Sequence, residues 1–280
     1  MRTETLIAEA GSALRAQGIH NGHQEARWLL LHALRGGPAA MPCGNGAELP
    51  AELEQSFRAL LQRRLAGEPL QYVMGSAEFY GLELEVGPGV LIPRPETERL
   101  VDFALAACPE CGPVCDLCTG SGAIALAIAH ARPRLKPVWA TDLSAEALAY
   151  ARRNAARLAL DVTFVQGDLW CAIPGTIRFA LVTANPPYVS PIDYAVLPAE
   201  VKDYEPRLAL WADQDGLALV RRIASESRDR LLPGAAVVCE IGSEQGAAAR
   251  EAFLATGYQA VDVRQDYTGR DRVVIARWTP

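Results

Sequence analysis

From Val114 onward, short apolar runs alternate along the chain with stretches whose apolar residues recur at helical spacing. The runs lie at Val114–Leu117, Val138–Thr141, Val162–Val165, Phe179–Thr183 and Ala235–Glu240, and the helical stretches lie at 123–132, 145–158, 212–232 and 244–256. This order is typical of a parallel sheet covered by helices on both faces. Two further strands, 259–264 and 272–278, predict a terminal hairpin. We therefore expect an α/β fold with a Rossmann-like, seven-stranded sheet.

The residues before this sheet have a different pattern. Apolar side chains at helical spacing predict three helices over 2–17, 23–35 and 51–66, and Gly/Pro-rich stretches at 36–38 and 42–46 separate the last two. Between about 70 and 92, apolar residues and glycines predict a β-hairpin. We expect a small all-α bundle at 1–70, a hairpin linker at 71–92 and a catalytic domain at 93–280; a length of 280 residues suits two domains.

Composition narrows the class of protein. Apolar residues make up 50% of the chain, which is enough for a sizeable core, and no stretch approaches the roughly 20 apolar residues that span a bilayer. The N-terminus lacks the long apolar segment of a secretory signal, so we expect a cytoplasmic protein. The net charge of −6 comes from residues 76–280, which argues against a nucleic-acid partner.

Seven cysteines, an odd number without secretory context, argue against a disulfide framework. Cys108 and Cys111 form one CxxC pair, and Cys115 and Cys118 form a second. Only three residues separate the pairs, whereas zinc ribbons place about 15 or more between them. We expect small buried thiols in this cluster and no metal; the other cysteines are Cys43, Cys171 and Cys239.

The first strand ends in a turn rich in small residues, Thr119-Gly-Ser-Gly-Ala123, and a helix follows at once. Gly120 and Gly122 would let the backbone approach a ligand at the helix N-terminus. The turn lacks the full GxGxxG dinucleotide fingerprint, since Ala125 stands three residues after Gly122 and Cys118 stands two residues before Gly120. A turn without a ligand therefore stays open as an interpretation.

An acidic residue ends each of the next two strands. Asp142 lies twenty residues after Gly122, the spacing at which an acid accepts hydrogen bonds from ribose hydroxyls. The third strand runs into Asp168-Leu169-Trp170. Trp170 could stack on an adenine, with Asp168 accepting a hydrogen bond from the adenine amine. Alternatively, Trp170 could be a core aromatic.

The fourth strand runs into Asn185-Pro186-Pro187-Tyr188. Two prolines cannot continue a central strand, so the chain must leave the sheet in a stiff turn at its carboxyl edge. That turn would fix the Asn185 side-chain oxygen and the Pro186 carbonyl as two acceptors for a planar NH2 group, with Tyr188 against its face. Such a grip aims a poorly nucleophilic nitrogen at a donor carbon and stabilises its developing positive charge, without a strong base.

Asn185–Tyr188 together with Asp116–Gly122 resemble the amino-methylating class of S-adenosylmethionine-dependent methyltransferases, which act on adenine, cytosine or glutamine nitrogens. Further stretches are similar to the HemK/PrmC family, the peptide chain release factor N5-glutamine methyltransferases: Gln71–Gly75, Glu78–Gly81, Leu91–Glu98 and Tyr204–Arg207. The resemblance covers the chain from about residue 70 to the end, and the helical bundle also suits the family.

This resemblance implies a class I methyltransferase fold and a helical domain that recognises the substrate. It implies that S-adenosyl-L-methionine binds to Thr119, Gly120, Ser121, Gly122, Ala123, Asp142, Asp168, Leu169, Trp170 and Asn185. It further implies that Asn185, Pro186, Pro187 and Tyr188 hold the GGQ glutamine of a release factor, with Asn185, Pro186 and Tyr188 catalytic. S-adenosyl-L-homocysteine would be the product, with no metal, membrane or direct nucleic-acid partner.

Other interpretations stay open at this stage. A glutamine methyltransferase of a large-subunit ribosomal protein would share the catalytic residues, and an N6-adenine DNA methyltransferase would use the same acceptor pair on a flipped base. A binding module that has lost catalysis and a nicotinamide dehydrogenase fit the motifs less well. In the flanking segments we expect Thr97 to cap a helix and Glu205 with Arg207 to form a surface ion pair.

Overall fold

The computed structural model describes residues 2–35, 49–213 and 215–279, which divide into two compact units. The first comprises Met1–Ser76 with Ala199–Tyr204, and the second comprises Ala77–Pro198 with Glu205–Pro280. The predicted loop at 36–38 and 42–46 lies outside the described residues.

The first unit is helical, as predicted. It contains α1 (Thr3–Ala16), α2 (Gly22–Arg35), α3 (Ala51–Leu65), α4 (Leu70–Met74) and α9 (Ala199–Lys202). The apolar stripes of the long helices form one core, in which Leu14, Leu29 and Phe57 are fully buried. The short helices α4 and α9 were not predicted.

The second unit contains the seven-stranded sheet, with strand order β5-β4-β3-β6-β7-β9-β8. The strands are β3 (Val114–Leu117), β4 (Val138–Asp142), β5 (Thr163–Gln166), β6 (Phe179–Ala184), β7 (Leu231–Glu240), β8 (Ala260–Gln265) and β9 (Asp271–Arg277). The first five strands in sequence pair in parallel, and the terminal hairpin adds β9 antiparallel to β7. The predicted fold class is confirmed.

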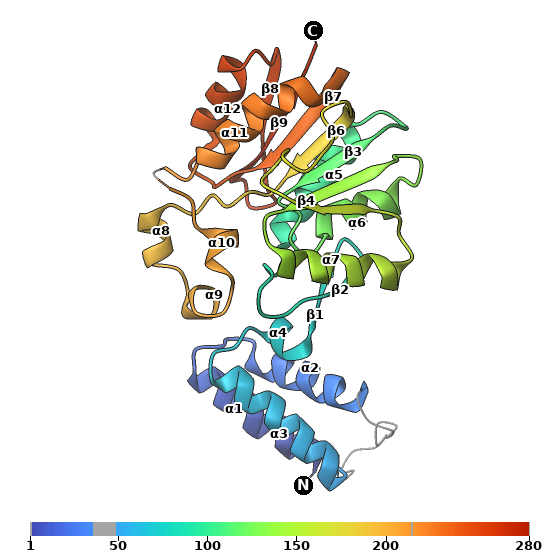
Figure 1. The fold of residues 1–280 in the computed structure, drawn as a ribbon. Helices are drawn as coiled ribbons and strands as arrows, with labels where there is room; N and C mark the ends of the chain where they lie inside the picture. Colours follow the sequence, from blue (N-terminus) through green and yellow to red (C-terminus); the bar gives the residue numbers. More distant parts are fainter. Residues whose placement is uncertain (1, 36–48, 214, 280) are drawn as a thin grey trace. The chain divides into compact units, whose positions relative to one another are not determined.

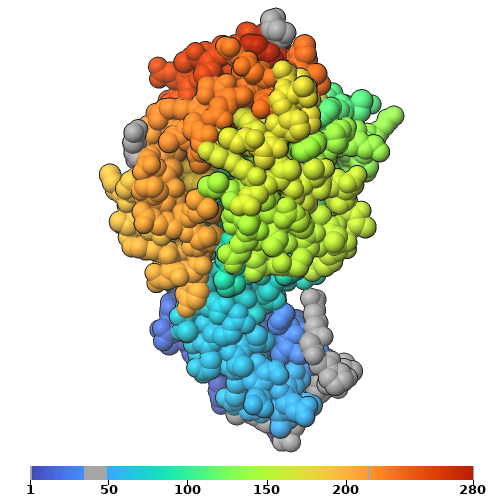
Figure 2. Space-filling model, in the orientation of Figure 1, coloured from blue at the N-terminus to red at the C-terminus, as the bar shows by residue number. Residues whose placement is uncertain are grey.

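Helices cover both faces of this sheet (Figure 1). One face packs on α5 (Glu98–Ala107), α6 (Ala123–Ala131) and α7 (Ala145–Leu158), and the other packs on α11 (Ala218–Ser227) and α12 (Gly246–Ala255). Alternate residues of one strand face the two cores. Val114 of β3 packs in the core with α5 and α6, and Cys115 packs in the core with α11 and α12. Figure 2 shows yellow-green segments near residue 150 and orange segments near residue 220 sharing one surface of this unit.

The hairpin β1 (Ser76–Phe79) and β2 (Leu82–Glu85) packs within the second unit. Phe79, Leu82 and Leu84 are buried in the core that α5 and α6 share. Asn154 of α7 holds β2 from the side, because its Oδ1 accepts from the Glu85 N–H at 2.6 Å and its Nδ2 donates to the Glu85 carbonyl at 3.1 Å.

The prediction of one helix over 212–232 gave the wrong bounds. The helix α11 begins only at Ala218, because Gly216 before it has a φ of +79° that no helix contains. After the 3₁₀ turn Arg228–Arg230, the chain is already extended at Leu231, where β7 begins. Two short helices, α8 (Pro191–Ala195) and α10 (Arg207–Leu210), occupy a stretch for which no element was predicted.

No helix among the described residues is both long enough and apolar enough to cross a membrane. Within the same residues, no group of three or more His, Cys, Asp or Glu side chains is arranged to hold a metal ion. The expectation of buried thiols is confirmed for Cys115, which lies fully buried in β3, and is wrong for Cys111, which is exposed; Cys108 and Cys118 are half-buried.

Candidate active site

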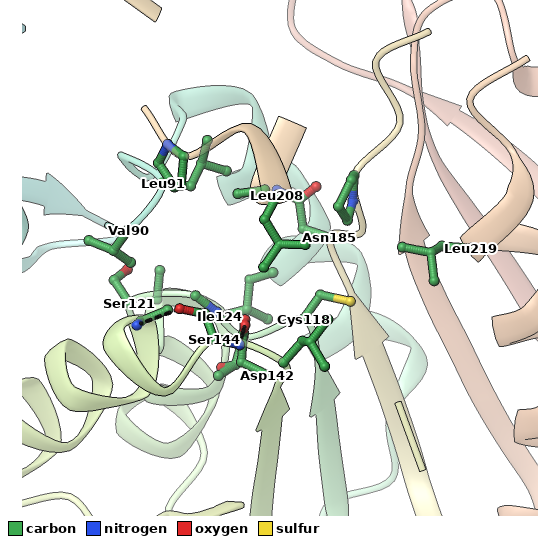
Figure 3. A pocket seen from close by; sticks show the side chains of 18 of the residues that line it. Val90, Leu91, Cys118, Ser121, Ile124, Asp142, Ser144, Asn185, Leu208 and Leu219 are labelled. Carbon is green, nitrogen blue, oxygen red and sulfur yellow. Dashed lines mark hydrogen bonds between the residues drawn. The ribbon is translucent and has the colours of Figure 1, made fainter. Parts of the chain in front are cut away.

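A cavity of about 270 Å³ opens at the carboxyl ends of β3, β4, β5 and β6, entirely within the second unit (Figure 3). This edge is where open α/β sheets bind ligands. Asp142 and Ser144 lie on one side of the view and Asn185 and Leu208 on the other. Of the residues that the sequence assigned to the cofactor or the substrate, those that line the cavity are Thr119, Gly120, Ser121, Ala123, Asp142, Asp168, Leu169, Asn185 and Pro187.

The turn from Thr119 to Ala123, the glycine turn, forms the floor between β3 and α6. Gly120 and Gly122 have φ of +56° and +83°, in the left-handed region that favours glycine. A Cβ on Gly120 would meet no atom within 4 Å, so open space lies beside the backbone there. A Cβ on Gly122 would instead meet Leu126 and Ala151 at 3.1 and 3.2 Å, and this glycine does not line the cavity. Gly120 therefore leaves room for a ligand, whereas Gly122 allows close packing of α6 on α7.

Asp116 of β3 holds the glycine turn from below. Its carboxylate is fully buried and accepts hydrogen bonds from the Thr119 hydroxyl at 2.6 Å and the Thr183 hydroxyl at 2.7 Å. Burial raises the pKa of Asp116 to about 7, although these hydrogen bonds oppose the shift. The residue joins β3, β6 and the glycine turn and lies behind the cavity wall.

Asp142 ends β4 and projects into the cavity. One carboxylate oxygen accepts from the Gly120 N–H and the other from the Ser144 N–H, each at 2.8 Å. Burial raises its pKa, and these backbone donors oppose the rise. Each oxygen of a carboxylate has a second lone pair, so Asp142 can still accept hydrogen bonds from a ligand.

The residues after β5 divide between the cavity and the core. Asp168 and Leu169 line the cavity, and the Asp168 carboxylate accepts from Arg222 of α11 at 3.0 and 3.1 Å. Trp170 is only 4% exposed, and its ring lies 5.6 Å from that of Phe179. Stacking of Trp170 on an adenine is therefore wrong for this conformation: Leu169 has a φ of +48°, and Trp170 packs in the core instead of lining the cavity.

The Asn-Pro-Pro-Tyr turn (Asn185–Tyr188) leaves β6 as predicted, at the rim of the cavity. The Asn185 Nδ2 donates to the Thr97 hydroxyl at 3.3 Å, which directs the side-chain oxygen the other way. The Tyr188 hydroxyl donates to Glu240 at 3.0 Å, and burial raises the pKa of this tyrosine. Pro186 is buried. Of the four residues, Asn185 and Pro187 line the cavity, whereas Pro186 and Tyr188 support the turn from behind.

Tyr188 is also fixed through its backbone. The Gln245 Nε2 donates to the Tyr188 carbonyl at 3.0 Å and to the Asp215 carbonyl at 2.9 Å. The Gln245 Oε1 in turn accepts from the Gly242 N–H at 2.8 Å. A side chain from the loop after β7 thus anchors the end of the Asn-Pro-Pro-Tyr turn.

Two segments that sequence reasoning did not assign to the site also line the cavity. They are Gly89–Leu91 with Pro93 and Thr97, and Pro206 with Leu208 and Ala209. The expected surface ion pair of Glu205 with Arg207 is wrong. Glu205 is buried, pairs with Arg94 and accepts from the Ile92 N–H at 3.1 Å, so that it ties the two segments together. Arg207 lies over the Trp211 ring. In the sequence, the prolines of these two segments were the feature that could have indicated their place at the site.

The sheet order, the antiparallel strand β9 and the cavity at the carboxyl edge define a class I methyltransferase fold. A methyltransferase from Pyrococcus furiosus shares this fold with a TM-score of 0.56, at 21% identity over 81% of this chain and 98% of the other. So does a Thermus thermophilus 16S rRNA N2 G1207 methyltransferase, solved with AdoMet and guanosine: the TM-score is 0.52, with 18% identity over 72% of this chain and 49% of the other.

Sequence comparison identifies the family. The model described as "PrmC N-terminal domain" matches residues 5–75, and the "Methyltransferase small domain" matches residues 98–201. A release factor glutamine methyltransferase from Neisseria gonorrhoeae is 40% identical over 91% of this chain and 93% of its own length. The chain belongs to the family of release factor glutamine methyltransferases, so the resemblance noted from its motifs is confirmed.

Proposed function

We propose that this enzyme transfers a methyl group from S-adenosyl-L-methionine to the side-chain amide nitrogen of the GGQ glutamine in peptide chain release factors. The observation that carries the proposal is the position of Asn185 on the wall of the cavity at the carboxyl edge of the sheet, in a chain of this family. The domains predicted at 1–70, 71–92 and 93–280 would then serve substrate recognition, linkage and catalysis.

The cavity suits the cofactor. Asp142 has free lone pairs for the two ribose hydroxyls, and the space beside Gly120 leaves room for the methionine part. Asp168 and Leu169 would lie by the adenine, with Asp168 shared between the adenine amine and Arg222. The bound sulfonium supplies an electrophilic methyl group.

The Asn-Pro-Pro-Tyr turn suits a primary amide. With its Nδ2 on Thr97, Asn185 presents Oδ1 as an acceptor for one amide N–H, and the Pro186 carbonyl would accept the other. These two acceptors would favour the positive charge that the nitrogen gains when it bonds to the methyl carbon, and the electron pair of the broken sulfur–carbon bond would stay on sulfur. The nitrogen would then lose a proton without a strong base, and Tyr188 would support the turn from behind.

The deciding experiment is methyl transfer from labelled S-adenosylmethionine to four acceptors side by side. These are purified release factor, its variant with the GGQ glutamine replaced, a large-subunit ribosomal protein, and adenine-containing duplex DNA. We expect label on the release factor that disappears with the glutamine variant. Label on the ribosomal protein or on DNA alone would refute the proposed substrate, and label on none of them with cofactor still bound would indicate a binding module.

A further inference from the structure

The Asn-Pro-Pro-Tyr turn is held at both of its ends. At its start, the Asn185 Nδ2 lies 3.3 Å from the Thr97 hydroxyl. Thr97 stands at the N-cap position of α5, but its side chain makes no capping hydrogen bond, contrary to the role expected from the sequence. At its end, Tyr188 is held through its hydroxyl by Glu240 and through its carbonyl oxygen by Gln245. The Gln245 side chain also bonds to two further segments, so it links the turn to the structure around it.

The chemistry of its partners fixes the orientation of the Gln245 amide. Its Nε2 faces the carbonyl oxygens of Tyr188 and Asp215 at 3.0 and 2.9 Å, and its Oε1 faces the Gly242 N–H at 2.8 Å. A carbonyl oxygen can only accept a hydrogen bond, and a backbone N–H can only donate one. The reversed amide would set its oxygen against two carbonyl oxygens. One planar group with two protons and an oxygen satisfies all three partners, which neither a carboxylate nor an apolar side chain could do.

The Gln245 side chain starts from a fixed point on the backbone. The Gln245 N–H donates to the Gly242 carbonyl at 3.0 Å, and the Gln245 carbonyl accepts from the Ala249 N–H of α12 at 2.9 Å. A Cβ on Gly216 would lie 2.4 Å from the Gln245 Nε2, so the chain passes close beside the amide at that glycine. Local hydrogen bonds and this close approach together place the amide.

On its other side, the amide holds the loop that leads into α11. The Asp215 carboxylate accepts from the Leu217 N–H at 3.1 Å and from the Arg221 guanidinium, which braces this loop at the start of the helix. Leu219 of α11 and Asn185 of the turn both line the cavity (Figure 3). One side-chain amide therefore joins two elements that each contribute to the cavity wall.

We propose that Gln245 is a positioning residue for methyl transfer, because its amide sets the place of Tyr188 relative to α11 and so keeps Asn185 at the cavity wall. The two prolines between Asn185 and Tyr188 have a fixed φ, so a displacement of one end of the turn is passed to the other. A misplacement of about 1 Å can lower the rate of a reaction about 100-fold. The kinetic consequence rests on the proposed function, whereas the hydrogen bonds belong to the protein without substrate.

Three single variants test the proposal. Gln245→Glu keeps the shape but sets a carboxylate oxygen against two carbonyl oxygens, and Gln245→Met fills similar space without the hydrogen bonds. Arg221→Ala is the matched control, since it breaks the exposed ion pair with Asp215 on the same loop. We expect kcat to fall by about 30- to 100-fold in Gln245→Glu and by about 10-fold in Gln245→Met, and to stay unchanged in Arg221→Ala. The Kd for S-adenosylhomocysteine should stay within about threefold of the parent in all three, because the Asp142 side of the cavity is intact.

A measurement without substrate tests the hydrogen bonds themselves. In enzyme labelled with ¹³C and ¹⁵N, the carbonyl carbon of Tyr188 should shift upfield in both Gln245 variants and stay in place in Arg221→Ala. The Gly242 N–H should exchange with solvent faster in Gln245→Met than in Gln245→Glu, whose carboxylate can still accept from it.

The outcomes separate this inference from the proposed function. If the parent methylates no release factor while the spectra behave as expected, the proposed substrate fails and the role of Gln245 in holding the turn stands. If kcat is equal in Gln245→Met and the parent, or if the carbonyl shift of Tyr188 is unchanged in Gln245→Met, the positioning role is overturned. Gln245→Met keeps the test decisive if Gln245→Glu fails to fold.

Discussion

Asn185 is the residue on which the proposed chemistry most directly depends. Asn185→Ala removes one of the two acceptors for the substrate amide and leaves the Asp142 side of the cavity intact. We expect turnover to fall by about 100-fold or more, with a much smaller change in cofactor affinity. Single-turnover methyl transfer and calorimetric titration of the cofactor would check both. Turnover equal to that of the parent would contradict the role of Asn185.

Asp142 should act on the cofactor and not on the methyl acceptor. Its carboxylate accepts from the Gly120 and Ser144 N–H groups and has lone pairs left for the ribose. Asp142→Ala should weaken cofactor binding by about 1–3 kcal/mol. Calorimetric titration with S-adenosylhomocysteine measures this directly, and an unchanged Kd would rule out the ribose assignment.

Asp116 should give the stability of the protein a dependence on pH. Its pKa is about 7 in the folded chain and 3.8 when exposed, so the folded state binds more protons in that interval and stability falls as pH rises through it. In Asp116→Asn this contribution is absent. We expect the stability of the parent relative to the variant to fall by about 2–4 kcal/mol between pH 4 and pH 7 and to level off above.

Urea unfolding of both proteins across this pH range is the measurement. The other titrating groups are common to both proteins and cancel in the difference. Two stability curves that stay parallel from pH 4 to pH 8 would show that Asp116 titrates outside this interval.

At the scale of elements, the Asn-Pro-Pro-Tyr turn depends on a glycine distant in sequence. Gly216, before α11, has a φ of +79°, and a Cβ there would lie 2.2 Å from the Tyr188 carbonyl oxygen. Gly216→Ala should therefore displace the turn, lowering stability by about 2 kcal/mol or more and turnover by at least about tenfold.

Gly269 provides the matched control, since its φ is also +79° and a Cβ there meets nothing within 4 Å. Gly269→Ala should lower stability by about 1 kcal/mol, the backbone cost alone, and leave turnover unchanged. Thermal unfolding and turnover of the two variants separate backbone strain from the collision. Equal effects of both substitutions would show that Tyr188 tolerates the contact.

At the scale of the whole molecule, each unit has its own core, and a buried ion pair supports the helical one. The Arg64 Nε donates to Glu25 at 2.7 Å, with both side chains 7% exposed. Arg64 also pairs with Glu200 of the segment 199–204, whose Tyr204 hydroxyl donates to the Ala66 carbonyl at 2.9 Å. One guanidinium thus joins α2, α3 and a segment more than a hundred residues later.

Glu25→Ala leaves that guanidinium buried with its main partner removed. We expect a loss of about 3 kcal/mol in the stability of the helical unit, against less than about 0.5 kcal/mol for Arg58→Ala, which breaks the exposed pair with Glu54. Hydrogen exchange of the full chain should show faster exchange in α1–α3 and unchanged exchange in the sheet. Uniform acceleration in both units would contradict independent cores.

The sequence alone determined what depends on local pattern. Alternating apolar runs and helical stretches were enough to predict the parallel sheet, because each element must bury one face. The glycine turn, Asp142 and the Asn-Pro-Pro-Tyr turn were found because each lies at the carboxyl end of a strand and therefore at the ligand-binding edge. The prediction failed where local pattern is ambiguous: the residues at 212–232 carry helical spacing, but the conformation of Gly216 and the strand at Leu231 limit the helix.

Tertiary structure alone decided the contacts between distant segments. Trp170 could face a ligand or the core until its packing on Phe179 was known, and Glu205 could be exposed until it was found buried with Arg94. The contacts of Glu240 and Thr97 with the Asn-Pro-Pro-Tyr turn join residues more than fifty positions apart. Periodicity and turn chemistry are written in neighbouring residues, whereas the partner of a buried polar group is set only when the chain has folded.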